Sequence, residues 1–227
     1  MNRFAVILLV IFSLILSASA SSEPELQLIT TNEISHVHPV RASRDAAVKI
    51  ISPNGGHGSG VYVIYKKQIG VLTAAHVVDT GNIYRIRGNE AEIFGAVVWR
   101  DDKADLAFLA VEEGLDRDPL KLAIARHLEA GSKVCYSGYP SSYELLSVNG
   151  QISGFDPRGY ILIQGFGWFG ASGSAVVDRN NRIVGIVSAL PVESFYGHPQ
   201  VLETLILISP LKEEHITQIE AVLDVLN

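Results

Sequence analysis

Short runs rich in β-branched residues, separated by glycine and polar turns, fill the chain from Ala46 to Ser209. Before residue 112 these runs are AAVKII, GVYVIY, GVLTAA, NIYRIR, AEIFGAVVW and DLAFLAV. After residue 131 they are KVCYSGY, LLSVNGQISGF, YILIQGF, GSAVVD, RIVGIVSAL and TLILIS. Many short strands without long helical patterns between them are typical of an all-β barrel or sandwich. The segment near residues 112–131 is expected to join two halves of similar strand count.

The tail after Pro210 has a different pattern. It carries apolar residues at helical spacing: Ile216, Ile219, Leu223 and Leu226. A proline just before such a stripe costs little, because the first N–H groups of a helix have no intrahelical partner. We therefore predict a C-terminal amphipathic helix within residues 211–227, covering the second half. The main domain is expected over residues 46–210, preceded by a polar arm or linker over residues 21–45.

The first twenty residues are typical of an export signal. Arg3 precedes an apolar stretch that continues to Leu16, and the small residues ASA occupy positions 18–20. Such a stretch is short for a bilayer span and suits a signal peptide cleaved after Ala20. The alternative is an uncleaved membrane anchor. We expect an exported protein, periplasmic or extracellular, which needs no membrane once the signal is removed.

Composition narrows the class of function. The formal net charge of −6 gives no basic footprint for nucleic acid. Cys135 is the single cysteine, so an intrachain disulfide is excluded, and its apolar strand pattern indicates a small buried side chain. The histidines outside the motifs below are too scattered to indicate a metal site, and no cofactor is expected: His36, His38, His127, His198 and His215.

Three stretches carry residues that can do chemistry together. His76 lies in TAAHVV, Asp105 in ADLAFL and Ser172 in GASGSAVV. Each alone is better explained as structural: a strand-end histidine, a turn aspartate and a serine between glycines. Together they have the groups of a nucleophilic triad, because a serine hydroxyl needs a base and the imidazole needs a carboxylate to hold its tautomer. Gly170, two residues before the serine, permits a turn that aims N–H groups at a developing oxyanion.

These three motifs resemble those of the trypsin/chymotrypsin-like serine protease superfamily, and more closely its bacterial HtrA/Deg-like branch. GHGSGVYV resembles the Gly-Ser-Gly strand before the histidine motif, YSGYPSS the Gly-Tyr-Pro segment, and RIVGIVSAL the strand flanking the substrate cleft. The resemblance covers roughly residues 46–209, in the family's order. It implies a fold of two six-stranded antiparallel β-barrels and a serine endopeptidase that acts on proteins or peptides through an acyl-enzyme.

The resemblance also implies roles for individual residues. His76 would be the general base, Asp105 its orienting carboxylate and Ser172 the nucleophile, with the N–H groups of Gly170 and Ser172 as oxyanion hole. Asp101 and Asp102 compete with Asp105, but only Asp105 is followed directly by the apolar run. Ser174 lacks a glycine two residues before it, and His57 is expected to be structural or exposed.

The chain departs from the family pattern next to the serine. Ala171 stands where the family has an acidic or amide residue, and no Ile-Val-Gly-Gly-like start is present. Both departures argue against activation in the manner of a trypsin zymogen. They also raise the question of what holds the turn at residues 170–172 in the shape that forms an oxyanion hole. No PDZ module follows within this sequence.

Substrate preference follows from the same alignment with the family. Phe166 and Gly167 would lie near the base of the primary specificity pocket, while Ser188, Ala189 and Leu190 would form a wall and the edge that pairs with substrate. Without an aspartate at the base, a small or medium apolar side chain is expected before the cleaved bond. Because of the altered loop, the alternative to an active enzyme is a catalytically inactive, protease-like binding or chaperone module.

Overall fold

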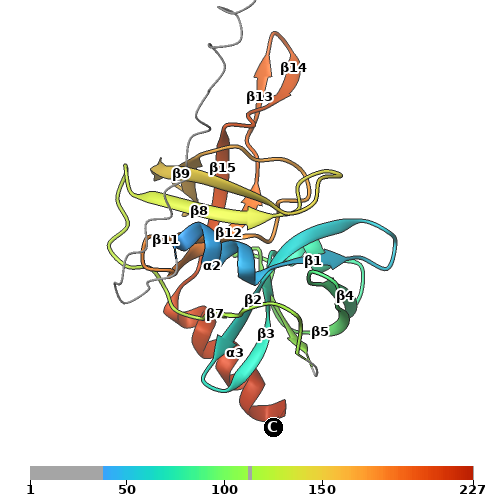
Figure 1. Ribbon diagram of the computed structural model, residues 1–227. Coiled ribbons are helices and arrows are strands. Elements are labelled where there is room, and N and C mark those ends of the chain that lie inside the picture. Colours follow the sequence, from blue (N-terminus) through green and yellow to red (C-terminus); the bar gives the residue numbers. More distant parts are fainter. Residues whose placement is uncertain (1–37, 112–113, 227) are drawn as a thin grey trace, which may run out of the picture. The chain divides into compact units, whose positions relative to one another are not determined.

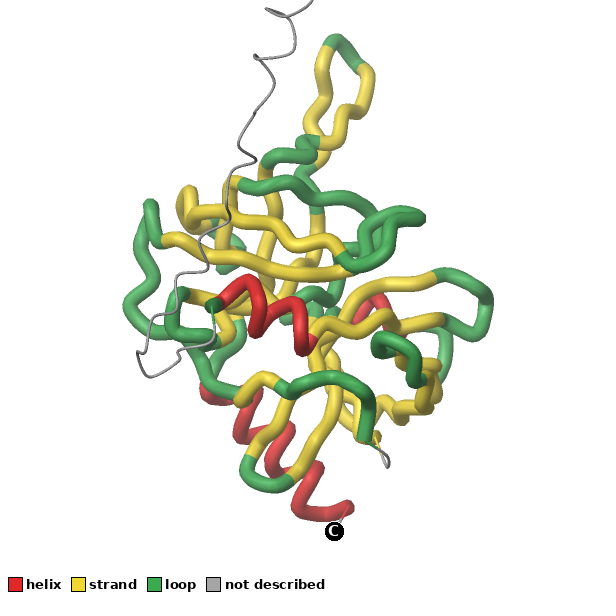
Figure 2. The backbone as a smooth tube through the Cα atoms, in the orientation of Figure 1, coloured by secondary structure: helices red, strands yellow, loops and turns green. Residues whose placement is uncertain are grey.

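The structure is a computed structural model, and it describes residues 38–111 and 114–226. The expected signal peptide, its alternative as a membrane anchor and most of the expected arm lie outside these residues. The described part is built mainly from strands, in two closed barrels that Figures 1 and 2 show with their helices. No helix in this part is long and apolar enough to cross a membrane.

The first barrel contains six antiparallel strands in the order β1-β4-β5-β6-β3-β2, closed by pairing of β1 with β2. Alternating side chains of these strands fill its interior, where Ile50, Val71, Tyr84 and Leu109 are fully buried. The two-residue strand β7 (Leu120–Lys121) adds to β2 in parallel. The six strands are β1 (Ala47–Ile51), β2 (His57–Tyr65), β3 (Gln68–Thr73), β4 (Ile83–Arg87), β5 (Glu92–Asp101) and β6 (Leu106–Val111).

The second barrel is also closed, in the order β10-β15-β12-β11-β8-β9. Tyr136, Ile152, Ile163 and Val176 pack in its core. With the first barrel it confirms the predicted fold of two six-stranded antiparallel barrels. The strands are β8 (Lys133–Gly138), β9 (Leu146–Phe155), β10 (Ile161–Gln164), β11 (Ala175–Asp178), β12 (Ile183–Ala189) and β15 (Leu205–Pro210).

Helix α2 (Pro39–Ala46) lies where the two barrels meet (Figure 2). Residues 39–45 of this helix fall in the segment expected to be a polar arm or linker, and the structure has a helix there instead. Pro39 favours the first helical turn because its φ is already helical, and the small residues Ala42 and Ala46 are buried against the barrels. The Arg44 guanidinium donates to the Leu145 carbonyl at 3.0 Å. The absence of large apolar residues concealed this helix in the sequence.

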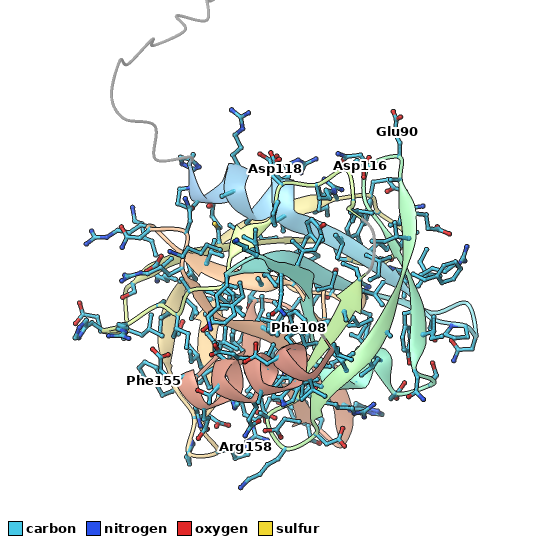
Figure 3. The ribbon with its side chains drawn as sticks, turned by 90° about the horizontal axis from the view of Figure 1, so that it is seen from below. Glu90, Phe108, Asp116, Asp118, Phe155 and Arg158 are labelled. Carbon is cyan, nitrogen blue, oxygen red and sulfur yellow. The ribbon has the colours of Figure 1, made fainter. Side chains whose placement is uncertain are left out.

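The predicted C-terminal helix is present as α3 (Glu213–Leu226), but it covers the first barrel rather than the second. Ile216, Ile219 and Leu223 are buried beside Phe108, which Figure 3 labels next to the helix. Leu226, expected on the same stripe, is 59% exposed. Polar bonds fix the helix to the first barrel: Tyr65 Oη to Glu220 (3.1 Å), Gln68 Nε2 to the Leu223 carbonyl (3.3 Å) and Trp99 Nε1 to Gln218 (3.1 Å).

A hairpin that the sequence analysis did not identify projects from the second barrel (Figure 1). Its strands, β13 (Val192–Phe195) and β14 (His198–Val201), pair only with one another among the described strands. Tyr196 and Gly197 both have positive φ, at 50° and 81°, which matches the twist that a two-residue hairpin turn requires. The hairpin follows directly after the residues expected to line the specificity pocket.

Candidate active site

His76 lies just after β3, in the short 3-10 helix Ala75–Val78. Ala74, Ala75 and Val78 are buried, so the turn packs tightly against the first barrel. The His76 side chain is left 47% exposed. This position suits a base that must reach substrate, because one ring edge can face the barrel while the other faces solvent.

Asp105 lies in the turn between β5 and β6, at a φ of 52°. Aspartate is among the residues that tolerate this left-handed region. The neighbouring Asp101 shapes the turn, because its Oδ1 accepts the N–H groups of Lys103 (3.0 Å) and Ala104 (2.9 Å). Asp102 pairs with Arg100 at 2.5 Å. Asp105 alone of the three aspartates points its carboxylate at His76.

The Asp105 carboxylate binds His76 at two points. The ring Nδ1 lies 2.9 Å from Oδ2 and 3.0 Å from Oδ1, and the His76 backbone N–H donates to Oδ1 at 3.0 Å. A carboxylate can only accept from Nδ1–H, so Nε2 of the neutral ring remains available to take a proton. This is the arrangement expected of a histidine base and its orienting carboxylate.

A third group, the hydroxyl of Ser188, also donates to Asp105 Oδ2. Burial favours the neutral carboxyl, but the hydrogen bonds from His76 and Ser188 outweigh it and hold the pKa of Asp105 below its ordinary value. The sequence analysis placed Ser188 only in the pocket wall and missed this contact. A serine at the end of a buried strand gives no local signal of a partner 83 residues away.

Ser172 lies in a turn bounded by Gly170 and Gly173, whose φ values are +93° and +92°. Side chains at these two positions would also collide with backbone. A Cβ on Gly170 would lie 2.6 Å from the Tyr139 carbonyl oxygen, and one on Gly173 would lie 1.9 Å from that of Ser59. The requirement at Gly173 was not recognised in the sequence. Ser172 itself is half-buried at the apex of this turn.

In this turn the carbonyl groups of Phe169 and Gly170 accept hydrogen bonds, whereas two N–H groups have no partner among the described residues. Ser141 N–H donates to the Phe169 carbonyl at 2.6 Å, and Ser59 Oγ donates to the Gly170 carbonyl at 2.8 Å. Within residues 38–111 and 114–226, the N–H groups of Gly170 and Ser172 have no hydrogen-bond acceptor. Two unpaired donors beside a serine hydroxyl are what an oxyanion hole requires.

Strand β12 and the start of β2 bring the three residues together. The Val187 carbonyl accepts Gly173 N–H at 2.8 Å, and the next residue, Ser188, holds Asp105. Gly58, on β2, packs between the turn of His76 and the turn of Ser172. A Cβ added to Gly58 would lie 2.7 Å from the Val77 methyl carbons and 3.2 Å from the Ser172 carbonyl oxygen. No hydrogen bond joins His76 and Ser172 in the described part of the chain. Such catalytic bonds often form only once substrate is bound.

Two apolar side chains pack closely against Gly167, one of the residues expected to bind substrate. A Cβ on Gly167 would lie 2.7 Å from Leu190 Cδ2 and 2.9 Å from Ile206 Cγ1. The sequence analysis did not identify Ile206. Phe166 is fixed through its carbonyl, which accepts the Tyr136 hydroxyl at 2.5 Å, while its side chain is 43% exposed. Ala189 lies at the exposed end of β12.

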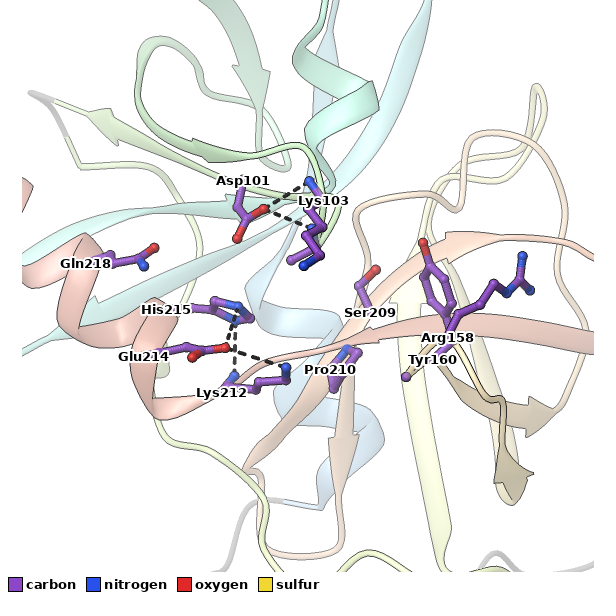
Figure 4. Close-up of a pocket in the computed structure, with 12 residues that line it drawn as sticks. Asp101, Lys103, Arg158, Tyr160, Ser209, Pro210, Lys212, Glu214, His215 and Gln218 are labelled. Carbon is purple, nitrogen blue, oxygen red and sulfur yellow. Dashed lines mark hydrogen bonds and ion pairs between the residues drawn. The ribbon is translucent and has the colours of Figure 1, made fainter.

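Two cavities lie away from this site. One of about 350 Å³ is formed by the β5–β6 turn, the end of β15 and α3 (Figure 4). Its His215 is buried and accepts the Lys212 N–H at Nδ1, 3.2 Å away. The other, of about 410 Å³, includes Asp116, whose carboxylate accepts the N–H groups of residues 89–91 at the edge seen in Figure 3. Neither cavity is lined by His76, Asp105 or Ser172.

Comparison with known proteins identifies the family. Residues 58–186 match the trypsin-like peptidase domain, a stretch that contains His76, Asp105 and Ser172. The chain belongs to this family. The prediction of a trypsin-like serine endopeptidase domain is therefore confirmed. A search of curated protein sequences finds no match to the chain.

Solved structures share the fold of this trypsin-like peptidase domain. The active form of the Rv3671c protease of Mycobacterium tuberculosis is 22% identical, with a TM-score of 0.62 over 79% of this chain and 81% of that one. Its inactive form is 23% identical, with a TM-score of 0.63 over 81% and 92%. A serine endoprotease of Yersinia pestis is 22% identical, with a TM-score of 0.64 over 84% and 68%.

Proposed function

We propose that this trypsin-like peptidase domain is an exported serine endopeptidase with His76, Asp105 and Ser172 as its triad. One observation carries the proposal: Asp105, itself held by Ser188, fixes the Nδ1 side of His76 next to a glycine-bounded serine turn with two unpaired N–H groups. Each group has the chemistry that its role requires, and all three come from separate segments of the chain.

The mechanism follows from the roles of these groups. His76 Nε2 takes the proton of the Ser172 hydroxyl as its oxygen attacks the scissile carbonyl. The N–H groups of Gly170 and Ser172 stabilise the negative oxygen that forms, and Asp105 stabilises the imidazolium. His76 then gives its proton to the leaving amine, which departs and leaves the acyl-enzyme. Water, deprotonated by the same imidazole, hydrolyses the ester and restores the serine.

The substrates of this endopeptidase are proteins or peptides with a small or medium apolar side chain before the cleaved bond. The close packing of Gly167 against Leu190 and Ile206 supports this preference, since both neighbouring side chains are apolar. Profiling of cleaved peptide libraries by mass spectrometry tests the preference. A majority of cleavages after arginine or lysine would contradict it.

Export is proposed from the N-terminal residues, with cleavage after Ala20. The apolar stretch and the ASA that follows it support this proposal. Mass spectrometry of the N-terminus of the secreted protein tests it. A chain that keeps Met1 and fractionates with membranes would favour the uncleaved anchor.

Labelling with a fluorophosphonate probe tests the catalytic proposal most directly. The purified protein is expected to gain one adduct by intact mass, whereas Ser172→Ala gains none and His76→Ala reacts far more slowly. The Ser174→Ala variant serves as a matched control, because Ser174 is a buried serine two positions away and should leave labelling intact. A folded protein that takes no adduct would favour the inactive binding or chaperone module.

A further inference from the structure

Ser59, in the Gly-Ser-Gly stretch at the start of β2, lies directly beneath the Ser172 turn. Its side chain is 0% exposed, and all of its polar atoms are bonded. The Ser59 N–H donates to the Ser172 carbonyl at 2.8 Å, while its own carbonyl accepts the Thr73 hydroxyl at 2.7 Å. A residue of the first barrel therefore holds the backbone of the nucleophile, which belongs to the second.

The Ser59 hydroxyl makes two further bonds to the second barrel. It donates to the Gly170 carbonyl at 2.8 Å and accepts the Tyr139 N–H at 2.8 Å. Because a hydroxyl is both donor and acceptor, this single oxygen links the Ser172 turn to the neighbouring Tyr139–Ser141 segment by hydrogen bonds. Space there is tight, since a Cβ on Gly138 would lie only 2.8 Å from the same oxygen.

The Tyr139–Ser141 segment in turn fixes the orientation of the Gly170 N–H. Ser141 N–H holds the Phe169 carbonyl at 2.6 Å. Because the C=O and N–H of one trans peptide unit point in opposite directions, a bound Phe169 carbonyl directs the Gly170 N–H away from Ser141. The His57 ring supports the segment from outside, with Nε2–H donating to the Tyr139 carbonyl at 3.0 Å.

Position 171 supplies no charged alternative to this support. Ala171 is buried in the apolar core of the second barrel, so an ion pair cannot hold the turn from that side. The hydrogen bonds of Ser59 reach the turn from the opposite side. They need neither a free N-terminus nor another subunit, because every partner lies within the described residues of this chain.

We infer that Ser59 is the positioning residue of the oxyanion hole, and that its hydroxyl keeps the turn in the catalytic shape without proteolytic activation. This inference rests on the proposed serine endopeptidase function. Ser59 touches no substrate. It acts by fixing the Gly170 peptide groups, so its loss weakens binding of the transition state more than binding of the substrate.

Ser59→Ala tests the inference by its effect on kcat and KM for a peptide substrate. Loss of one oxyanion donor costs about 10²- to 10³-fold in kcat, so a displaced donor is expected to cost roughly 10- to 100-fold, with KM changed by less than about threefold. A peptide boronic acid, whose adduct places an oxygen in the hole, should lose affinity by a factor similar to that for kcat/KM. Ser174→Ala, another buried serine, should change neither value.

Amide hydrogen exchange provides a readout that does not depend on activity. In a Ser172→Ala background, addition of Ser59→Ala should speed exchange in peptides covering residues 139–141 and 168–173, and leave strands β4 and β5 unchanged. Unchanged exchange in the two segments would overturn the inference. Faster exchange in a protein whose wild type takes no fluorophosphonate would support Ser59 as the support of the turn and refute the endopeptidase.

Two further variants test the role of Ser59 if Ser59→Ala does not fold. Ser59→Cys keeps a side chain of similar size with a weaker donor, and His57→Ala removes the outer support from a half-buried position. Each is expected to lower kcat several-fold, with the larger loss in Ser59→Cys. Wild-type kcat and boronate affinity in both variants would overturn the inference.

Discussion

At the residue scale, three nearby aspartates have different partners: Asp101, Asp102 and Asp105. Asp101 accepts backbone N–H groups and shapes the turn, Asp102 pairs with Arg100, and Asp105 holds His76. The apolar run that follows Asp105 singled it out in the sequence. The hydrogen bond between Ser188 and Asp105 could not be predicted from the sequence, because Ser188 lies on a strand of the other barrel.

Ser188→Ala is expected to raise the pKa of Asp105 towards its ordinary value, because a donor to the carboxylate is lost. A carboxyl whose pKa is lower in the folded than in the unfolded state stabilises the fold at neutral pH, and this contribution disappears as pH falls through the folded value. The variant should therefore be about 2 kcal/mol less stable at neutral pH. Its difference from wild type should shrink as pH falls below the ordinary carboxyl value of 3.8.

Urea denaturation at a series of pH values measures this effect, and kcat/KM should fall about tenfold if Asp105 is less well held. Ser209→Ala is the matched control, since Ser209 is a buried serine on β15 whose hydroxyl has no partner in the described residues. A stability loss in Ser188→Ala that stays constant over the whole pH range would contradict the role of Asp105.

Helix α3 illustrates the element scale. Its amphipathic pattern was clear in the sequence, but the pattern did not indicate which barrel would receive it. The choice follows from partners on β2, the β2–β3 turn and β5, including Tyr65 and Trp99. The first barrel therefore gains an apolar cover that its own strands do not supply.

Ile219→Ala should lower the free energy of unfolding by about 3 kcal/mol, because the side chain is fully buried beneath the helix. Chemical denaturation measures the loss. Val225→Ala on the same helix is the control, since Val225 is 84% exposed and its truncation should cost less than about 0.5 kcal/mol. Equal costs in the two variants would mean that α3 does not pack on the barrel in solution.

The two barrels are coupled at the scale of the whole molecule. One apolar cluster draws residues from both barrels and from α3. Polar bonds also cross in both directions: Ser59 of the first barrel holds the Ser172 turn of the second, and Ser188 of the second holds Asp105 of the first. The site exists only where both barrels are folded.

A single cooperative unfolding transition is therefore expected. The chain has two tryptophans, Trp99 in the first barrel and Trp168 in the second, so Trp99→Phe and Trp168→Phe each leave one reporter. Fluorescence followed in urea should give each variant the same midpoint as its own far-UV circular dichroism. Fluorescence and circular dichroism midpoints separated by more than about 0.5 M within either variant would contradict coupling of the barrels.

The sequence by itself determined the features that depend on local pattern. Strand runs with glycine turns predicted an all-β barrel or sandwich in two halves, and helical spacing predicted α3. The order of the three motifs indicated the family, and the resemblance to that family implied two six-stranded barrels. These predictions succeed because alternation, periodicity and motif spacing are properties of short segments. Helix α2 and the β13–β14 hairpin were missed, because small buried residues and an exposed hairpin leave weak patterns.

Only the tertiary structure decided the features that depend on contacts between distant segments. It placed α3 on the first barrel, brought Ser188 to Asp105, and put Ser59 beneath the turn that contains Gly170 and Ser172. A hydrogen bond across two barrels leaves no periodicity in either strand. Its geometry arises when the barrels pack, because a hydroxyl can then reach backbone groups more than a hundred residues away.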